Sequence, residues 1–127
     1  MEIKKILVAD DEDAIRAYIE RKLDKLGYKV FSAKDGEEAL EQTFSNFPDL
    51  ILLDVKMPKL TGIEACKIIK SDERTKHIPV IMLSAKAQSH EIETGLRAGA
   101  DKYLCKPLGF PDILKEIQAF GQGNLRG

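Results

Sequence analysis

The sequence predicts a single α/β domain, in which a parallel five-stranded sheet is covered on both faces by five helices. Short apolar runs of strand length alternate along the whole chain with stretches whose apolar residues recur at three- and four-residue spacing. The chain has 127 residues, which is the size of one ordinary domain. Parallel strands are joined by right-handed crossovers, so the common doubly wound order for this size, 2-1-3-4-5, is expected.

Five apolar runs are predicted to be the strands. Most end at an acidic, polar or proline-containing segment, which marks the end of a strand. The third run is the most apolar, and its continuous Leu and Ile residues are typical of a strand buried on both faces of a parallel sheet. The strands are expected at residues 3–9, 28–32, 50–54, 79–83 and 103–105.

The segments between these runs are predicted to be helices. In the first helix, Asp13 is expected to be the N-cap and Gly27 the C-cap. The second and third helices begin with the spacing of a capping box, at Asp35 and at Thr61. The helices are expected at residues 13–26, from 35 to just before 48, and at 61–69, 89–98 and 111–120. A domain over 1–121 would then be followed by a flexible tail over 122–127.

Composition limits the classes of function. Twenty basic residues against twenty-one acidic ones give a net charge of −1, so no overall field would recruit nucleic acid or an anionic membrane. Cys66 and Cys105 are isolated in apolar surroundings, which favours small core residues over a metal site. The N-terminal residues lack the basic, apolar and small-residue pattern of a signal sequence, and no apolar run reaches membrane-spanning length. We therefore expect a cytoplasmic protein that binds neither DNA nor membranes directly.

Three aspartates are expected to meet at the carboxyl edge of this sheet. Asp10 and Asp11 follow the first strand and Asp54 ends the third, and these strands are neighbours in the expected order. Crowded carboxylates repel one another unless a cation lies among them, and oxygen ligands without Cys or His favour magnesium. The simpler alternative is that these acids cap a helix and a loop. Since a cap needs only one acid, the doubled aspartate favours a Mg²⁺ site.

A hydroxyl and a cation are expected at the same edge. Ser84 follows the fourth strand, and Lys106 follows the fifth, immediately before Pro107. Alone, such a serine caps a turn and such a lysine is solvated, but a following proline restricts the backbone of Lys106 and favours an inward side chain. Together with a metal, these groups supply what phosphoryl transfer to a carboxylate needs, because each equatorial oxygen requires a positive or donor partner. Asp54 is the expected acceptor.

Four motifs follow one another in a set order. They are the acidic cluster Asp10-Asp11-Glu12, the loop 54–58, the pair Ser84-Ala85 and the stretch 99–107. In this order they resemble the receiver domain of bacterial two-component response regulators, including the stand-alone chemotaxis type. The resemblance covers nearly all of the chain.

The resemblance implies how the metal and the phosphoryl group would be bound. Asp54 would be phosphorylated by a histidine kinase, a phosphotransfer protein or a small acyl phosphate. Asp11, Asp54 and the backbone carbonyl of Lys56 would bind Mg²⁺, and Asp10 would hold a metal-bound water.

The resemblance also implies a switch. Lys106, Ser84 and the backbone of Ala85 would bind phosphoryl oxygens, and the Lys106–Pro107 peptide bond would be cis. Ser84 would move toward the phosphoryl group and let Tyr103 turn inward, which would remodel the surface of the last two helices and the strand between them, where partners usually bind. Dimerisation through this surface stays open, as does the choice between a stand-alone regulator and a part of a longer one.

Two lysines depart from the commonest pattern near the phosphoryl group. Lys56 and Lys86 are long cations at variable positions, and we expect them to shield the acyl phosphate from water and lengthen its lifetime. The alternative, two solvated lysines at the rim, is equally favoured by the sequence.

Three other functions fit the same topology less well. A phosphohydrolase that forms an aspartyl phosphate needs a second acid two residues after the nucleophile, and here that residue is Lys56. A flavin-binding protein of this flavodoxin-like topology needs a phosphate-binding loop after the first strand, where this chain has carboxylates. A docking module that is never phosphorylated would not need the full set of site residues. The sequence therefore favours a regulatory switch that modifies only itself, rather than an enzyme.

Overall fold

The computed structural model describes residues 2–85 and 88–123 and has the predicted α/β architecture. All strands of the sheet are parallel and lie in the order β2-β1-β3-β4-β5, as predicted. The strands are β1 (Lys5–Ala9), β2 (Lys29–Ala33), β3 (Leu50–Asp54), β4 (Val80–Ser84) and β5 (Lys102–Cys105). The helices are α1 (Asp13–Lys25), α2 (Gly36–Asn46), α3 (Gly62–Ser71), α4 (Ser89–Arg97) and α5 (Phe110–Gly123).

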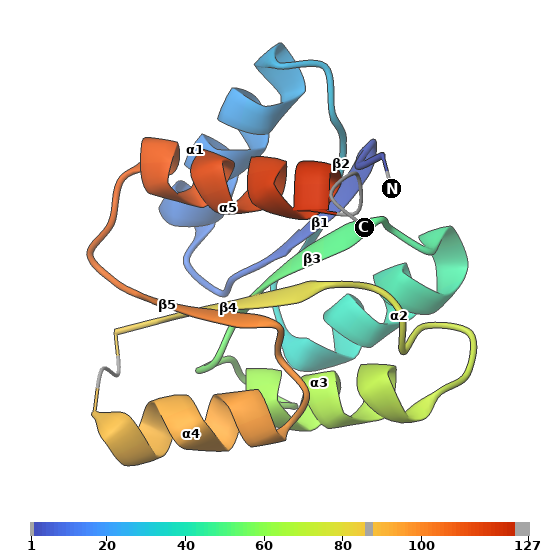
Figure 1. Ribbon diagram of the computed structural model, residues 1–127, viewed down its shortest axis with the longest axis vertical. Helices are drawn as coiled ribbons and strands as arrows, with labels where there is room; N and C mark the ends of the chain where they lie inside the picture. Colours follow the sequence, from blue (N-terminus) through green and yellow to red (C-terminus); the bar gives the residue numbers. More distant parts are fainter. Residues whose placement is uncertain (1, 86–87, 124–127) are drawn as a thin grey trace.

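The helices form two layers around the sheet (Figure 1). Helices α1 and α5 cover one face, and α2, α3 and α4 cover the other. Each face has its own apolar core, and alternate residues of the central strands contribute to the two cores. In β3, Leu50 and Leu52 pack under α1 and α5, whereas Ile51 and Leu53 face the other layer. Because β3 is fully buried, its last residue is fixed at the edge of the sheet.

The predicted helices and strands are present, but some of them begin or end at other residues than predicted. Asp13 was expected to be the N-cap of α1, but the N-cap is Glu12, and Asp13 is the first helical residue. The N–H of Glu12 donates to the side chain of Asp10 in the preceding loop, and the chain enters the helix one residue earlier than predicted. Gly27 was expected to be the C-cap of α1, but the C-cap is Leu26; Gly27 follows it with a φ of 96°, a conformation that glycine adopts readily. Helix α5 runs to Gly123, two residues past the predicted domain end.

The capping predictions for α2 and α3 hold, with one difference between them. At α3 both halves of the capping box form, between Thr61 and Glu64. At α2 the side chain of Asp35 accepts from the backbone N–H of Glu38, while the Glu38 carboxylate accepts from Lys34 instead of closing the box. Across the described ranges, no helix has both the length and the apolar character needed to cross a membrane.

Candidate metal centre and the residues around it

The three aspartates converge at the carboxyl edge of β1 and β3, as the predicted strand order requires. Asp10 follows β1, Asp54 is the last residue of β3, and β1 and β3 are paired in register. One carboxylate oxygen from each of Asp10, Asp11 and Asp54 lies within 4.8 Å of the others. Asp10 is only 1% exposed and Asp54 only 6%, whereas Asp11 is open to solvent.

This donor set fits a hard divalent cation. All three ligand atoms are carboxylate oxygens, which suit Mg²⁺ or Ca²⁺ and not a soft metal. Two of the carboxylates are buried, and buried like charges at this distance are costly without a counter-charge. The exposed side of Asp11 leaves room for water ligands, which Mg²⁺ usually keeps.

Arg16 holds the acidic loop in place, although its position in the sequence did not mark it as a site residue. Its guanidinium donates to the backbone carbonyl of Asp10 at 2.7 Å and to the carboxylate of Asp13 at 2.6 Å. The guanidinium also forms an ion pair with the carboxylate of Glu20, at 3.8 Å. The spacing of Asp13, Arg16 and Glu20 predicts ion pairs along one helix face, but the hydrogen bond to Asp10 depends on how the loop folds back.

Lys106, which follows β5, also contacts the acidic cluster. Its ammonium lies 3.2 Å from Asp10 Oδ2 and 3.6 Å from Asp54 Oδ2, and the side chain is 20% exposed. The backbone N–H of Lys106 donates to the carbonyl of Ser84 at 2.7 Å, which continues the pairing of β4 and β5 beyond the strands. The Lys106–Pro107 peptide bond is cis, the geometry that the resemblance implied. The inward direction of this lysine follows the sequence-based expectation.

Burial and neighbouring charges shift the pKa values of Asp54 and Lys106. Burial, followed by the neighbouring carboxylate of Asp10, raises the pKa of Asp54 to about 6, although Lys106 and the backbone N–H of Lys56 act in the opposite direction. Burial disfavours the charge on Lys106, but Asp54 and Asp10 outweigh that effect and raise the pKa of Lys106 above its ordinary value. Near neutral pH the site therefore holds anionic oxygens around one cation.

The loop after Asp54 is packed tightly against the start of α3. The N–H of Gly62 donates to the carbonyl of Val55 at 2.8 Å, and a Cβ added at Gly62 would lie 2.1 Å from the carbonyl oxygen of Asp54. Met57 is buried and packs into the core. The side chain of Lys56, two residues after Asp54, is exposed.

The predicted switch residues lie on the next two strands. Ser84 is the buried last residue of β4, and Ala85, which follows it, is exposed. Tyr103, on β5, lines a pocket of about 140 Å³ to which α3 and α4 also contribute, and its ring lies where a Cβ at Gly95 would approach to 2.7 Å. Lys86, the second lysine expected near the phosphoryl group, lies outside the described residues.

Comparison with known proteins assigns the family. The sequence profile described as "Response regulator receiver domain" matches residues 6–118, so the chain belongs to this family. It is a response regulator receiver domain of two-component signalling.

Named relatives and a solved structure agree with this assignment. The chain is 42% identical over 116 residues to the alkaline phosphatase synthesis transcriptional regulatory protein PhoP of Bacillus subtilis, covering 91% of this chain and 48% of the relative. It is 41% identical over 115 residues to the response regulator MprA of a Mycobacterium species, covering 91% and 49%. The chemotaxis response regulator CheY4 of Vibrio cholerae superposes with a TM-score of 0.86 at 34% identity, covering 91% of this chain and 97% of that structure. The chain spans about half the length of these curated relatives.

Proposed function

We propose that this receiver domain is a phosphorylation-dependent switch whose acceptor is Asp54. A histidine kinase or a phosphotransfer protein would supply the phosphoryl group, and Mg²⁺ would be required. One observation carries the proposal: the carboxylate of Asp54 lies within 4.8 Å of the carboxylates of Asp10 and Asp11 and 3.6 Å from the ammonium of Lys106. A carboxylate that only capped a loop would need neither acidic neighbours nor an ammonium group beside it.

Each residue of the site has a separate task in this reaction. A carboxylate oxygen of Asp54 attacks phosphorus, the bond from phosphorus to the donor nitrogen breaks, and the bonding electrons leave with the donor. Lys106 then pairs with one phosphoryl oxygen, and the hydroxyl of Ser84 and the backbone N–H of Ala85 would bind others. Asp10, Asp11, Asp54 and the Lys56 carbonyl would hold Mg²⁺, which neutralises charge on the phosphoryl oxygens when bound, with Asp10 acting through a water.

Phosphorylation would be communicated through Ser84 and Tyr103. Ser84 stands at the end of β4, and Tyr103 packs on α4 from the neighbouring strand β5. A shift of Ser84 toward the phosphoryl group would draw the following loop and change the packing of Tyr103, so that the α4-β5-α5 surface is remodelled. The output would be a downstream protein, an output domain or a second copy bound to this surface, in the cytoplasm.

Lys56 and Lys86 would set how long the signal lasts. The exposed side chain of Lys56 lies on the loop that carries Asp54 and can shield the acyl phosphate from water. We expect phospho-Asp54 to decay faster in Lys56→Asn and Lys86→Glu than in the wild type. Equal decay rates would assign both lysines to the solvated surface.

The proposal is tested by incubation with Mg²⁺ and acetyl phosphate. Intact mass spectrometry should show a gain of one phosphoryl group, which EDTA prevents. Asp54→Ala should abolish the gain, while Asp49→Ala, at the amino end of β3, should retain it. If neither acetyl phosphate nor a histidine kinase modifies the wild type, a docking module that works without phosphorylation becomes the better account.

A further inference from the structure

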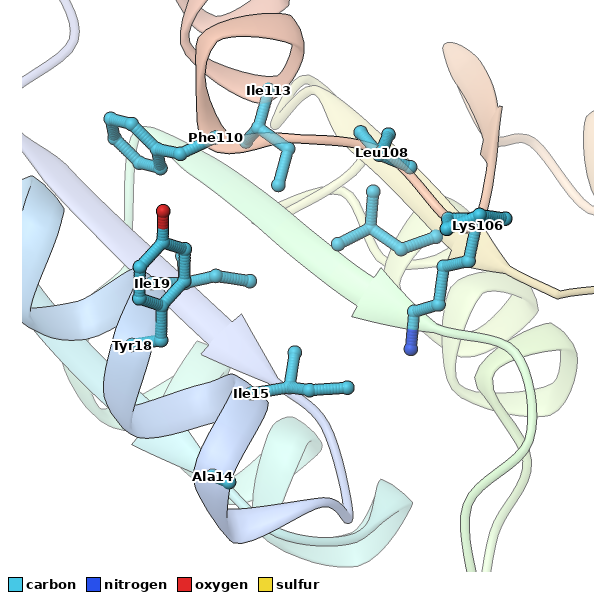
Figure 2. A pocket seen from close by; sticks show the side chains of 10 residues that line it. Ala14, Ile15, Tyr18, Ile19, Lys106, Leu108, Phe110 and Ile113 are labelled. Atoms are coloured by element: carbon cyan, nitrogen blue, oxygen red, sulfur yellow. The ribbon is translucent and has the colours of Figure 1, made fainter.

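An apolar groove opens beside Lys106, between α1 and α5 (Figure 2). It has a volume of about 380 Å³. Ile15 and Tyr18 line it from α1, and Phe110 and Ile113 line it from the first turn of α5. The phosphoryl chemistry described above uses none of these four residues, although the groove shares Lys106 with that site.

The residues that line the groove are mostly apolar, and one of them carries a charge. Lys106 is the only ionisable cation among the residues that form the groove, and Figure 2 shows its ammonium at one end of the space. Tyr18 is 46% exposed although its ring is large, so much apolar surface here is open to solvent. A concave apolar site with one well-placed charge is typical of a small-molecule site.

The charged end of the groove is also the reactive end. The ammonium of Lys106 is 3.6 Å from the carboxylate of Asp54, so a group bound at Lys106 lies next to the proposed acceptor. An occupant that complements this arrangement has an anionic end at Lys106 and an apolar part lying toward Tyr18. An acyl phosphate with an apolar acyl chain has this chemistry.

We propose that the groove binds the acyl chain of small acyl phosphate donors and makes the domain selective for apolar ones. This inference rests on the proposed phosphorylation of Asp54 and adds the substrate class. The Asp54 oxygen attacks phosphorus while the bond from phosphorus to the bridging oxygen breaks. The bonding electrons leave on that oxygen, the acyl group departs as a carboxylate, and no proton is needed.

The test compares alkanoyl phosphates of increasing length with Mg²⁺ present. Propionyl, butyryl and hexanoyl phosphate have leaving groups of nearly equal basicity, so differences in kcat/KM for Asp54 phosphorylation report binding of the chain. Full burial of one CH2 group corresponds to a factor of about four in kcat/KM. We expect roughly a five-fold or larger rise from propionyl to hexanoyl phosphate, since the groove is partly open.

Substitution of a groove residue tests the location. Tyr18→Gln should flatten the dependence on chain length, because the far end of the groove loses its apolar wall. Ile68→Gln is the matched control: Ile68 is 42% exposed, lies on α3 and does not line the groove. The control should keep the full dependence. Thermal melts establish that both variants are folded.

The outcomes separate this inference from the proposed function. If acetyl phosphate modifies Asp54 but kcat/KM is independent of chain length, the groove is not a donor site and the inference is overturned, while the switch stands. A chain-length dependence that Tyr18→Gln leaves intact also overturns it. If neither acyl phosphates nor a kinase modify Asp54, both proposals fail.

Discussion

Asp54 carries an energetic cost in the unmodified protein, because it is buried beside another carboxylate. Its pKa is raised from an ordinary value of 3.8 to about 6, so the folded state binds the proton more tightly than the unfolded chain does. The stabilisation from that proton is complete below 3.8 and is lost as the pH rises through about 6. At neutral pH without Mg²⁺, the ionised Asp54 therefore destabilises the fold.

Asp54→Asn should remove this cost. We expect the metal-free variant to be more stable than the wild type at pH 8 by roughly 1–3 kcal/mol, with a smaller difference at pH 5. Urea unfolding at the two pH values measures it. Adding Mg²⁺ should stabilise the wild type more than the variant, because the wild type offers one more anionic ligand. A variant that is less stable than the wild type at pH 8 would contradict this electrostatic account.

Arg16 should act on the metal through the acidic loop. Arg16→Met removes the donor to the Asp10 carbonyl, so the loop is held less firmly, and we expect Mg²⁺ affinity to fall roughly ten-fold, at the lower end of outer-shell effects. Titration calorimetry measures this directly. Arg16→Lys should recover part of the affinity, and Arg21→Met, an exposed arginine on the same helix, should leave it unchanged. Equal losses in both Met variants would point to a general charge effect instead.

At the scale of elements, α3 holds the acceptor loop in place. Gly62 begins this helix, and the backbone of Asp54 and Val55 occupies the space where a side chain would lie. The sequence marked Thr61 and Glu64 as the start of the helix, but it did not show that the next residue must be glycine. That requirement comes from the approach of two segments, which local spacing does not encode.

Gly62→Ala should therefore displace the loop. We expect a loss of roughly 1–3 kcal/mol in unfolding free energy, as for overpacking of a core, together with slower phosphorylation by acetyl phosphate. Gly121→Ala is the control, because the nearest atom to an added Cβ there is 3.6 Å away and alanine favours the helix. It should be neutral or stabilising. If the two variants were equally stable, the loop after Asp54 could move without any loss of unfolding free energy, and this prediction would be wrong.

The strands and helices themselves were predictable, because local patterns dictate them. Continuous apolar runs gave β3 and β4 within a residue, and the capping box at Thr61 gave the start of α3. The start of α1 was missed because Asp10 binds the N–H of Glu12, a contact made by a loop held in place by the sheet. Arg16 was overlooked for the same reason.

At the scale of the whole molecule, the strand order creates the site. It makes β1 and β3 neighbours, so Asp10 and Asp54 meet although they are far apart in sequence, and the end of β5 brings Lys106 to the same edge. Alternation of elements and a preference for right-handed crossovers were enough to predict this convergence. The groove between α1 and α5 was not predictable, because it depends on how two helices separated by most of the chain pack beside each other.

The proposed functional sites lie in different parts of the molecule. The acidic cluster opens at the carboxyl edge, the groove proposed to bind donors lies on the α1 and α5 layer, and Tyr103, the proposed switch residue, packs against α4 in the other layer. The curated relatives are about twice as long as this chain. In a protein of that length, the proposed output through the α4-β5-α5 surface would act on a further domain.

The central claim is that Asp54 receives the phosphoryl group. Borohydride reduction of the acyl phosphate after treatment with acetyl phosphate and Mg²⁺, followed by peptide mapping, identifies the modified side chain. The account predicts reduction at Asp54 alone, and none when EDTA is present. Reduction at Asp10 or Asp11, or the same yield at Asp54 without a divalent metal, would contradict it.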